Sequence, residues 1–340
     1  MSAKLSIGYI GNGKSTNRYH LPFVLRLKDK ITVKTIYERS QNHAWERIEG
    51  IKYTSELNHL LNDDAIQAVV ITTPPESHYE LAKCVIKSGK HCVVEKPFTE
   101  TAEQAEELFR LAEDKGVMIQ CYQNRRFDSD FLTVQEVIRG GKLGDLLEME
   151  MHYDYFRPEV PEAGSFSKVH SYLYGHACHT LDQVISLFGE PGKVHYDVRQ
   201  LLGTGRMNDY FDIDMQFGAL KVSVKSSYFR IKERPSFVVY GKKGMFVKAT
   251  KDRQEEHLKL FYMPGQPGFG LDTPAHYGTL TYQDADGSYH EESVKSVSGD
   301  YARYYEALYE TLLQGREPLV SKRETMLQIN MLEQGIQGLS

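Results

Sequence analysis

The chain has 340 residues, which is enough for two domains with sizeable cores. Its net charge of −5 at pH 7 argues against a nucleic-acid partner. No apolar run is long enough to span a membrane, and the first residues lead directly into a predicted strand without a signal peptide. Four cysteines without paired spacing are typical of reduced thiols in a cytoplasmic protein: Cys84, Cys92, Cys121 and Cys178.

A glycine-containing turn follows the first predicted strand, residues 5–10. Gly11 allows a tight bend, and Gly13 lets a pyrophosphate approach the backbone. The next helix would direct its free N–H groups and the positive end of its dipole at the phosphates. Thr16 stands where dinucleotide-binding patterns have a third glycine, so a strand-to-helix turn without a ligand stays an alternative. The other residues predicted to bind the cofactor here are Asn12, Lys14 and Ser15.

The second predicted strand, residues 31–37, ends at the position that selects the cofactor. An acidic side chain here usually accepts hydrogen bonds from the adenosine ribose, so Glu38 favours NAD. An arginine suits a 2′-phosphate, so Arg39 with Ser40 favours NADP. The charges do not settle the choice, because Arg39 can also be a solvated turn residue or stack on adenine.

Three further apolar runs predict buried strands, at residues 68–73, 91–94 and 117–122. A helix over about residues 78–88 separates the first two of them. Another helix begins at a capping-box pattern formed by Thr101 and Gln104 and stops at Gly116. This alternation of strands and helices predicts a parallel, doubly wound Rossmann sheet over residues 1–122.

Lys96 is the first candidate for catalysis. It follows strand 91–94 in the triplet Glu95-Lys96-Pro97, and the carboxyl ends of such strands face the crevice where ligands bind. Pro97 restricts Lys96 to an extended conformation. An ammonium group held there can hydrogen-bond a substrate hydroxyl and stabilise alkoxide charge. The alternative, a lysine reaching into solvent, is less favoured because a nucleotide-binding signature precedes the triplet.

The second half of the chain, residues 123–340, alternates between polar and apolar residues, most clearly in 148–155. Hairpins are predicted at 211–226 and 235–248, with a later turn at 284–287. We therefore expect an α+β domain with a mostly antiparallel sheet, of which helices cover one face and leave the other open.

A predicted helix ending near residue 188 carries His176, His179 and Asp182 at three-residue spacing, so that they share roughly one face. A histidine can take up a proton at neutral pH while a hydride leaves the same carbinol carbon. The same pattern is compatible with zinc, although no cysteine cluster supports a metal, and two ordinary helical histidines are a third interpretation. Arg125 and Arg126 can bind a polyol or form a salt bridge; we favour a structural role for Arg126 and leave Arg125 open.

Taken together, these motifs resemble the Gfo/Idh/MocA oxidoreductase family. The matching segments follow one another in the right order over most of the chain: 11–13, Thr73-Pro74 with His78, 95–97, 122–128, 140–144 and 179–183. The segments 124–133 and 299–301 are similar to a narrower group, the NADP-dependent scyllo-inositol dehydrogenases and their relatives.

The resemblance implies an NAD(P)-dependent oxidoreductase that transfers a hydride between nicotinamide and a secondary alcohol of a cyclic polyol or sugar. Lys96 would bind the reacting oxygen, and His179 would accept or relay its proton, so no metal is required. NADP is slightly favoured over NAD. The open face of the second sheet would form a homodimer or homotetramer, unless it is solvated, and the loop 157–169 would carry specificity. Cofactor contacts are implied for Thr73, Pro74, His78, Glu95 and Lys96, and substrate contacts for His176, Arg125 and Asp182.

One position departs from the family pattern. Four residues before the acid/base histidine the family usually has an aspartate, and this chain has Gly175. The carboxylate that normally supports His179 or binds substrate is therefore missing, and His176, Asp182 or a residue from another segment has to replace it. If none does, the chain is a catalytically silent dinucleotide-binding sensor or scaffold.

Overall fold

The computed structural model describes residues 3–159 and 167–337. The chain divides into two compact units, each of which is described by itself. The first contains residues up to 124 and also two later segments, 260–266 and 301–330. The second contains residues 125–259, 267–300 and those from 331 onward. The predicted domains, 1–122 and 123–340, are consecutive stretches of sequence, whereas each compact unit combines segments from different parts of the chain. The division into two consecutive domains remains a prediction.

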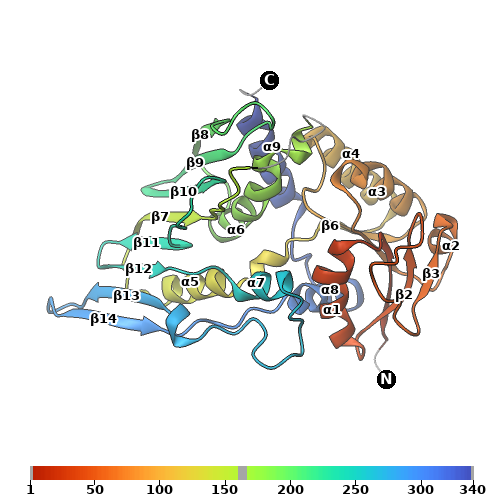
Figure 1. Cartoon of the computed structure of the whole chain (residues 1–340), viewed down its shortest axis with the longest axis horizontal. Coiled ribbons are helices and arrows are strands. Elements are labelled where there is room, and N and C mark those ends of the chain that lie inside the picture. Colours follow the sequence, from red (N-terminus) through yellow and green to blue (C-terminus); the bar gives the residue numbers. More distant parts are fainter. Residues whose placement is uncertain (1–2, 160–166, 338–340) are drawn as a thin grey trace. The chain divides into compact units, whose positions relative to one another are not determined.

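The first unit is built on a six-stranded parallel sheet with strand order β3-β2-β1-β4-β5-β6. Figure 1 labels β2, β3 and β6 of this sheet. The order reverses between β1 and β4, as in a doubly wound fold, so the predicted Rossmann sheet is confirmed. The prediction missed β3, because its three residues do not form an apolar run. The strands are β1 (Leu5–Ile10), β2 (Ile31–Tyr37), β3 (Lys52–Thr54), β4 (Ala68–Ile71), β5 (His91–Val94) and β6 (Ile119–Cys121).

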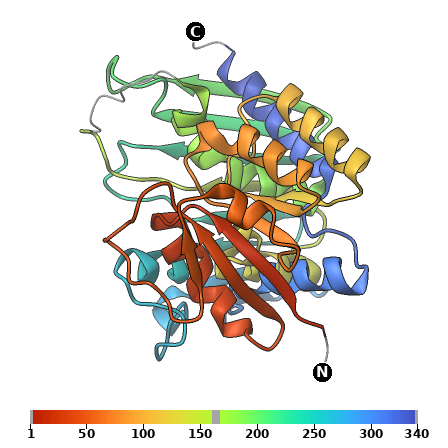
Figure 2. The same cartoon turned by 90° about the vertical axis from the view of Figure 1, so that its right-hand side faces the viewer.

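Helices cover both faces of this sheet. α3 (His78–Lys87) and α4 (Ala102–Lys115) pack against each other, and α1 (Leu21–Val24) packs against α8 (Ala302–Gln314). Figure 2 shows α3, drawn in orange, next to α4, drawn in yellow. The remaining helical segments of this unit are α2 (Leu57–Leu61), η2 (Leu25–Leu27) and η3 (Pro75–Ser77), and α9 (Lys322–Ile336) continues from it into the second unit.

The start of α4 follows the predicted capping pattern in part. The Thr101 hydroxyl accepts a hydrogen bond from the Gln104 N–H at 3.2 Å. The Gln104 side chain, however, accepts from the N–H of Glu100 at 3.1 Å, one residue before the position that a capping box uses. Gly116 ends the helix in the left-handed conformation, with φ of 65°, as its lack of a Cβ atom allows.

The helix after the glycine turn is irregular. A π-helical segment, η1 (Thr16–His20), precedes α1 and buries Thr16, Arg18 and His20. A π-helical turn holds more residues than an α-helical one, so the side chains in it leave the regular 3.6-residue spacing. Such segments are rare and are frequent at functional sites.

The second unit contains an eight-stranded sheet of order β14-β13-β12-β11-β7-β10-β9-β8. Neighbouring strands are antiparallel except β7 and β10, which run parallel. Both predicted hairpins and the later turn are observed. The strands are β7 (Leu146–His152), β8 (Lys193–Arg199), β9 (Tyr210–Phe217), β10 (Leu220–Ser227), β11 (Phe237–Gly241), β12 (Gly244–Lys248), β13 (Gly278–Gln283) and β14 (Tyr289–Val294).

One face of the second sheet is covered by helices. α5 (Ser129–Arg139) packs against β12, and α6 (Cys178–Phe188) packs against β10. The opposite face carries ion pairs between neighbouring strands, such as Lys221–Asp214 at 3.1 Å and Lys225–Glu150 at 3.3 Å. The expected alternation of a covered and an open, polar face is therefore confirmed. The other helical segments of this unit are η4 (Asn124–Phe127), η5 (Lys168–His170), η6 (Leu173–Ala177), α7 (Arg253–Lys259) and η7 (Pro274–His276).

No helix within residues 3–159 and 167–337 combines the length and the apolar character that crossing a membrane demands.

Candidate functional site

The glycine turn at the end of β1 is shaped for a phosphate. Gly11 has φ of 116°, and a Cβ atom there would lie 2.7 Å from the Thr72 hydroxyl, so only glycine fits. A Cβ atom on Gly13 would meet no atom within 4 Å, so the space beside it is open to a ligand. The Thr16 hydroxyl donates to the Gly11 carbonyl at 2.9 Å. The residue at the third glycine position thus closes the turn with its side chain.

Glu38, at the end of β2, is buried and anchored by several donors. Its carboxylate accepts from the Asn12 amide at 2.9 Å, the Asn42 N–H at 3.0 Å and the Arg47 guanidinium at 2.5 Å. Burial alone would raise the pKa of Glu38, but these hydrogen bonds outweigh it and hold that pKa below its usual range. Arg39 and Ser40 are exposed. Sequence reasoning missed Asn42 and Arg47, which follow Glu38 in an irregular loop.

This geometry leads to a test of cofactor preference. Arg39→Ala should weaken NADP binding by roughly tenfold or more and leave NAD binding nearly unchanged, because only a 2′-phosphate loses a charge-assisted partner. The measurement is the dissociation constant of each dinucleotide for the wild type and the variant. Equal losses for both dinucleotides would mean that Arg39 stacks on adenine, and no loss would remove it from the site.

Glu95, directly before Lys96, takes part in a chain of buried hydrogen bonds. Its Oε1 atom accepts from the Ser15 hydroxyl at 2.5 Å and lies 2.9 Å from His20 Nε2. His20 Nδ1 lies 2.5 Å from the Tyr305 hydroxyl, which is 2.7 Å from the Tyr9 hydroxyl. The chain therefore connects the end of β5 with the π-helical segment η1 and with α8.

Lys96 is positioned by this chain of hydrogen bonds. Its backbone N–H donates to Glu95 Oε2 at 3.0 Å, its side chain is half-buried, and the peptide bond to Pro97 is cis. Burial would raise the pKa of Glu95, but hydrogen bonding from His20, the His20 and Lys96 charges and the Ser15 hydroxyl together lower it well below its usual range. Glu95 is therefore a fixed negative charge beside Lys96.

His78 connects two loops at the carboxyl ends of β4 and β5. Its Nδ1 atom lies 2.9 Å from the Pro97 carbonyl oxygen, and its Nε2 atom lies 2.9 Å from the Thr73 carbonyl oxygen. Burial lowers the pKa of His78, although both carbonyl groups favour the protonated ring. Both ring nitrogens are used within the protein, so His78 holds the Thr73 and Pro97 carbonyl groups together; the cofactor contacts of Thr73, Pro74 and His78 remain predictions.

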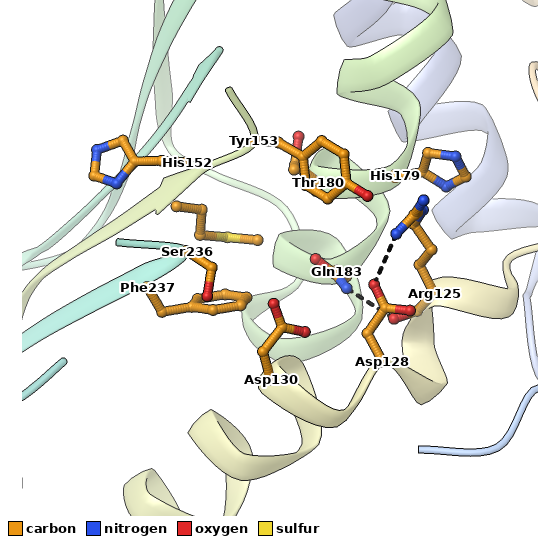
Figure 3. A pocket seen from close by; sticks show the side chains of 11 residues that line it. Arg125, Asp128, Asp130, His152, Tyr153, His179, Thr180, Gln183, Ser236 and Phe237 are labelled. Atoms are coloured by element: carbon orange, nitrogen blue, oxygen red, sulfur yellow. Dashed lines mark hydrogen bonds and ion pairs between the residues drawn. The ribbon is translucent and has the colours of Figure 1, made fainter. Parts of the chain in front are cut away.

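In the second unit, His179 and Arg125 line one pocket (Figure 3). Arg125 forms ion pairs with Asp128 at 3.1 Å and Glu255 at 3.3 Å, and its guanidinium lies 4.9 Å from the centre of the Tyr153 ring. Most other lining side chains are polar or aromatic and come from η4, α5, α6 and the β7 and β11 regions: Asp128, Asp130, Met151, His152, Tyr153, Thr180, Gln183, Ser236 and Phe237.

The other two predicted substrate contacts have different neighbours. The ring of His176 lies 4.4 Å from that of Tyr172 and 5.1 Å from that of Tyr155, centre to centre. Asp182 accepts two hydrogen bonds from Arg126, both at 2.8 Å. The π-helical segment η6 contains His176 and interrupts the regular spacing on which the shared face was predicted. This ion pair fits the structural role that we favour for Arg126, and it favours a structural role for Asp182 too. The predicted contact of Asp182 with substrate remains a prediction.

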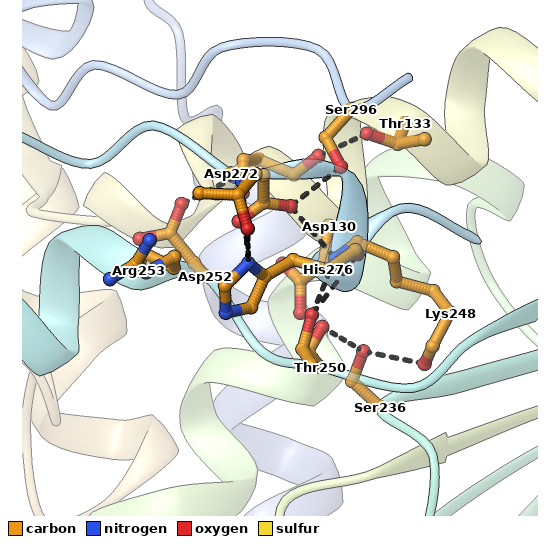
Figure 4. Close-up of polar contacts among 12 residues, drawn as sticks. Asp130, Thr133, Ser236, Lys248, Thr250, Asp252, Arg253, Asp272, His276 and Ser296 are labelled. Carbon is orange, nitrogen blue, oxygen red and sulfur yellow. Dashed lines mark hydrogen bonds and ion pairs between the residues drawn. The ribbon is translucent and has the colours of Figure 1, made fainter. Parts of the chain in front are cut away.

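Asp130 lines the pocket and also lies among the side chains of a buried polar cluster (Figure 4). In this cluster the buried Lys248 ammonium donates to Asp272 at 2.9 Å and to the Thr250 hydroxyl at 2.7 Å. Burial raises the pKa of Asp130, and the nearby Asp252 carboxylate raises it further. Asp130 is therefore a carboxyl group that retains its proton more readily than an ordinary aspartate.

Gly175 leaves room where the expected carboxylate is missing. A Cβ atom there would meet no atom within 4 Å, so packing does not exclude a side chain. The carboxyl groups that line the His179 pocket are those of Asp128 and Asp130. Sequence reasoning did not assign them a role, although both follow Arg125 closely in the chain. No three His, Cys, Asp or Glu side chains in the described ranges are arranged to hold a metal ion.

Comparison with known proteins finds one family whose two domain models match the two halves of the chain. Residues 5–123 match the model of the oxidoreductase family, NAD-binding Rossmann fold, and residues 135–338 match the C-terminal alpha/beta domain of the same family. The chain belongs to the Gfo/Idh/MocA oxidoreductase family. The family has an NAD-binding Rossmann domain, and the open space beside Gly13 in the glycine turn is compatible with the phosphates of NAD(P).

Several relatives align over nearly the whole chain. The uncharacterized oxidoreductase YhhX of Escherichia coli (strain K12) is 42% identical, covering 99% of this chain and 97% of that protein. The scyllo-inositol 2-dehydrogenase (NADP(+)) IolW of Bacillus subtilis (strain 168) is 32% identical, covering 98% and 93%. A crystal structure of an oxidoreductase from Bacillus cereus is 45% identical, with a TM-score of 0.92 and coverage of 98% and 95%. The predicted resemblance to the Gfo/Idh/MocA family is confirmed.

The loop predicted to carry substrate specificity, residues 157–169, lies in part outside the described residues, because these stop at 159 and resume at 167.

Proposed function

We propose that the chain transfers a hydride between NAD(P) and a secondary alcohol of a cyclic polyol or sugar. The observation that carries the proposal is the pocket around His179, where Arg125, Asp128 and Asp130 supply hydrogen-bond donors and acceptors beside the Tyr153 ring. Groups of this kind hydrogen-bond several hydroxyls and stack on a sugar ring. The similarity to a scyllo-inositol 2-dehydrogenase supports the same substrate class.

In this proposal two side chains act on the alcohol. Bound nicotinamide supplies the hydride acceptor or donor. Lys96 hydrogen-bonds the reacting oxygen and stabilises its negative charge, so the hydroxyl loses its proton more readily. His179 accepts that proton during oxidation and returns it during reduction. Oxidation of the alcohol therefore gives the ketone, the reduced dinucleotide and one proton. Glu95 and His20 hold the Lys96 backbone in place.

Two further proposals concern the partner and the location of the protein. We infer a homodimer or homotetramer through the open face of the second sheet, where exposed Tyr240 lies among strands that carry paired charges on β7, β9 and β10. Because the charges on this face are already paired within the sheet, the desolvation penalty for burying the face against a second copy of the chain is lower. We also infer a cytoplasmic protein, since its cysteines are free and Cys92 and Cys121 are buried.

A silent dinucleotide-binding sensor is the second candidate, and Gly175 is the observation that favours it. A panel of cyclic polyols and sugars, each tested with NAD and NADP while nicotinamide absorbance is followed, separates the two candidates. A dehydrogenase changes the absorbance with at least one cyclic polyol or sugar. Tight binding of dinucleotide without any change over the whole panel would support the sensor and reject the proposed enzyme.

A further inference from the structure

A short segment from late in the chain belongs to the first unit. Residues 260–266, which we name the strap, group with the Rossmann unit, whereas the residues on both sides of the strap belong to the second unit. Phe261 provides its contacts: the Arg18 guanidinium lies 4.6 Å from the centre of the Phe261 ring, and the Trp45 ring centre lies 6.0 Å away. The strap thus bridges the helix after the glycine turn and the loop after β2.

The backbone of Phe261 is strained. Its φ of 58° makes it the one non-glycine residue with positive φ in the described ranges, a conformation unfavourable for an aromatic residue. Phe261 is also 54% exposed, so core packing does not explain its position. Strained residues persist where surrounding structure or function over-determines them. Here the ring of the strained residue lies over the Arg18 guanidinium.

Arg18 is a buried cation without a protein counter-charge. The residue is only 6% exposed, and its Nε atom has no hydrogen-bond partner within residues 3–159 and 167–337. The same ranges contain no carboxylate that forms an ion pair with it. An isolated charge is expensive to bury, and buried charges are therefore normally paired. The missing partner of Arg18 is expected to be an anion that is not part of the chain.

The position of Arg18 indicates which anion this is. Arg18 lies in η1, five residues after Gly13, in the helical stretch that follows the glycine turn. In dinucleotide-binding folds the start of this helix is where the phosphates bind. The glycine turn binds the pyrophosphate, which both NAD and NADP contain. The 2′-phosphate of NADP, in contrast, belongs to the end of β2, where Arg39 is exposed.

We propose that Arg18 binds the pyrophosphate of the dinucleotide and that the strap holds the Arg18 guanidinium in place by stacking Phe261 on it. A guanidinium group presents a planar fork of donors that matches phosphate oxygens. An aromatic ring over one side of that plane limits its rotation and excludes water from that side. The proposal depends on NAD(P) binding alone, so it holds for an enzyme and for a silent sensor.

The test compares Arg18→Met with the wild type. Methionine keeps an unbranched apolar chain under Phe261 and removes the charge. We expect the dissociation constants of NAD and NADP, measured by calorimetry, to rise by the same factor, about tenfold to a hundredfold. Arg39→Ala is the matched control, because it should weaken NADP alone. Trp45 is the single tryptophan of the chain, so its fluorescence reports independently whether a dinucleotide alters the environment beside Phe261.

A second variant protects the test against misfolding. Phe261→Gly removes the ring and relieves the positive φ, so it should keep the thermal unfolding temperature and still weaken both dinucleotides by roughly threefold to tenfold. Unchanged affinities in a folded Arg18→Met protein would overturn the proposal. A loss confined to NADP would also overturn it, since Arg18 would then serve the 2′-phosphate. If Phe261→Gly bound both dinucleotides like the wild type, the strap would have no part in binding.

Discussion

Replacing Lys96 by alanine should lower turnover by about two to four orders of magnitude and leave the affinity for dinucleotide nearly unchanged. This range is typical for the loss of one preorganised electrostatic donor at a developing oxyanion. We expect this selective effect because Lys96 follows β5, which β4 separates from β1 and its glycine turn. Steady-state rates on a substrate from the polyol and sugar panel measure the first effect, and calorimetric titration with NAD and NADP measures the second.

Lys87→Ala is a suitable control for this experiment. Lys87 is an exposed lysine at the end of α3 in the same unit, and no role in the site is assigned to it. Its removal changes the net charge by the same amount as the loss of Lys96 and should leave the rate within about a factor of two. A Lys96→Ala protein that turns over at nearly the wild-type rate would refute the assignment of Lys96. A large loss of dinucleotide affinity would show that Lys96 mainly binds cofactor.

Most strands of the two units could be predicted because they have a simple apolar pattern, whereas β3 and β8 were missed. β4 is a continuous apolar run, as expected for a strand buried on both faces, and β9 and β10 alternate around a two-residue turn. β3 has neither pattern and is held by its pairing with β2, which local sequence does not reveal. Periodicity therefore predicted most of the longer strands, although the alternating seven residues of β8 were not recognised.

The surroundings of the candidate residues could not be predicted in the same way. His20 meets Tyr305, which is 285 residues later in the chain, and no local pattern connects them. The π-helical segment η6 contains His176, so the regular helical spacing that was assumed for His176, His179 and Asp182 does not hold there. The strap lies in the Rossmann unit although its neighbours in sequence do not. Such contacts are decided by tertiary packing, which local sequence rules do not capture.

Introducing an aspartate at Gly175 should preserve or raise the activity of an active enzyme. A Cβ atom at this position meets no atom within 4 Å, and the residue lies within η6, where a side chain is favoured over glycine. The new carboxylate would restore the group that the family pattern places four residues before His179. Gly175→Asn is the matched control, since it adds nearly the same volume without the charge. Turnover with NAD and NADP is measured for both variants over the polyol and sugar panel. A gain in Gly175→Asp that Gly175→Asn lacks shows that the charge is responsible.

His179→Ala completes this test, because the restored carboxylate is expected to act through that histidine. In an active enzyme, turnover should depend on pH through the protonation of His179, and the alanine variant should lose this pH-dependent limb. The aspartate at position 175 should then have no benefit in the His179→Ala background. A benefit that survives without His179 would mean that the carboxylate contacts substrate directly. If the wild type binds dinucleotide tightly, turns over nothing, and gains turnover only with Gly175→Asp, then the sensor interpretation replaces the dehydrogenase one.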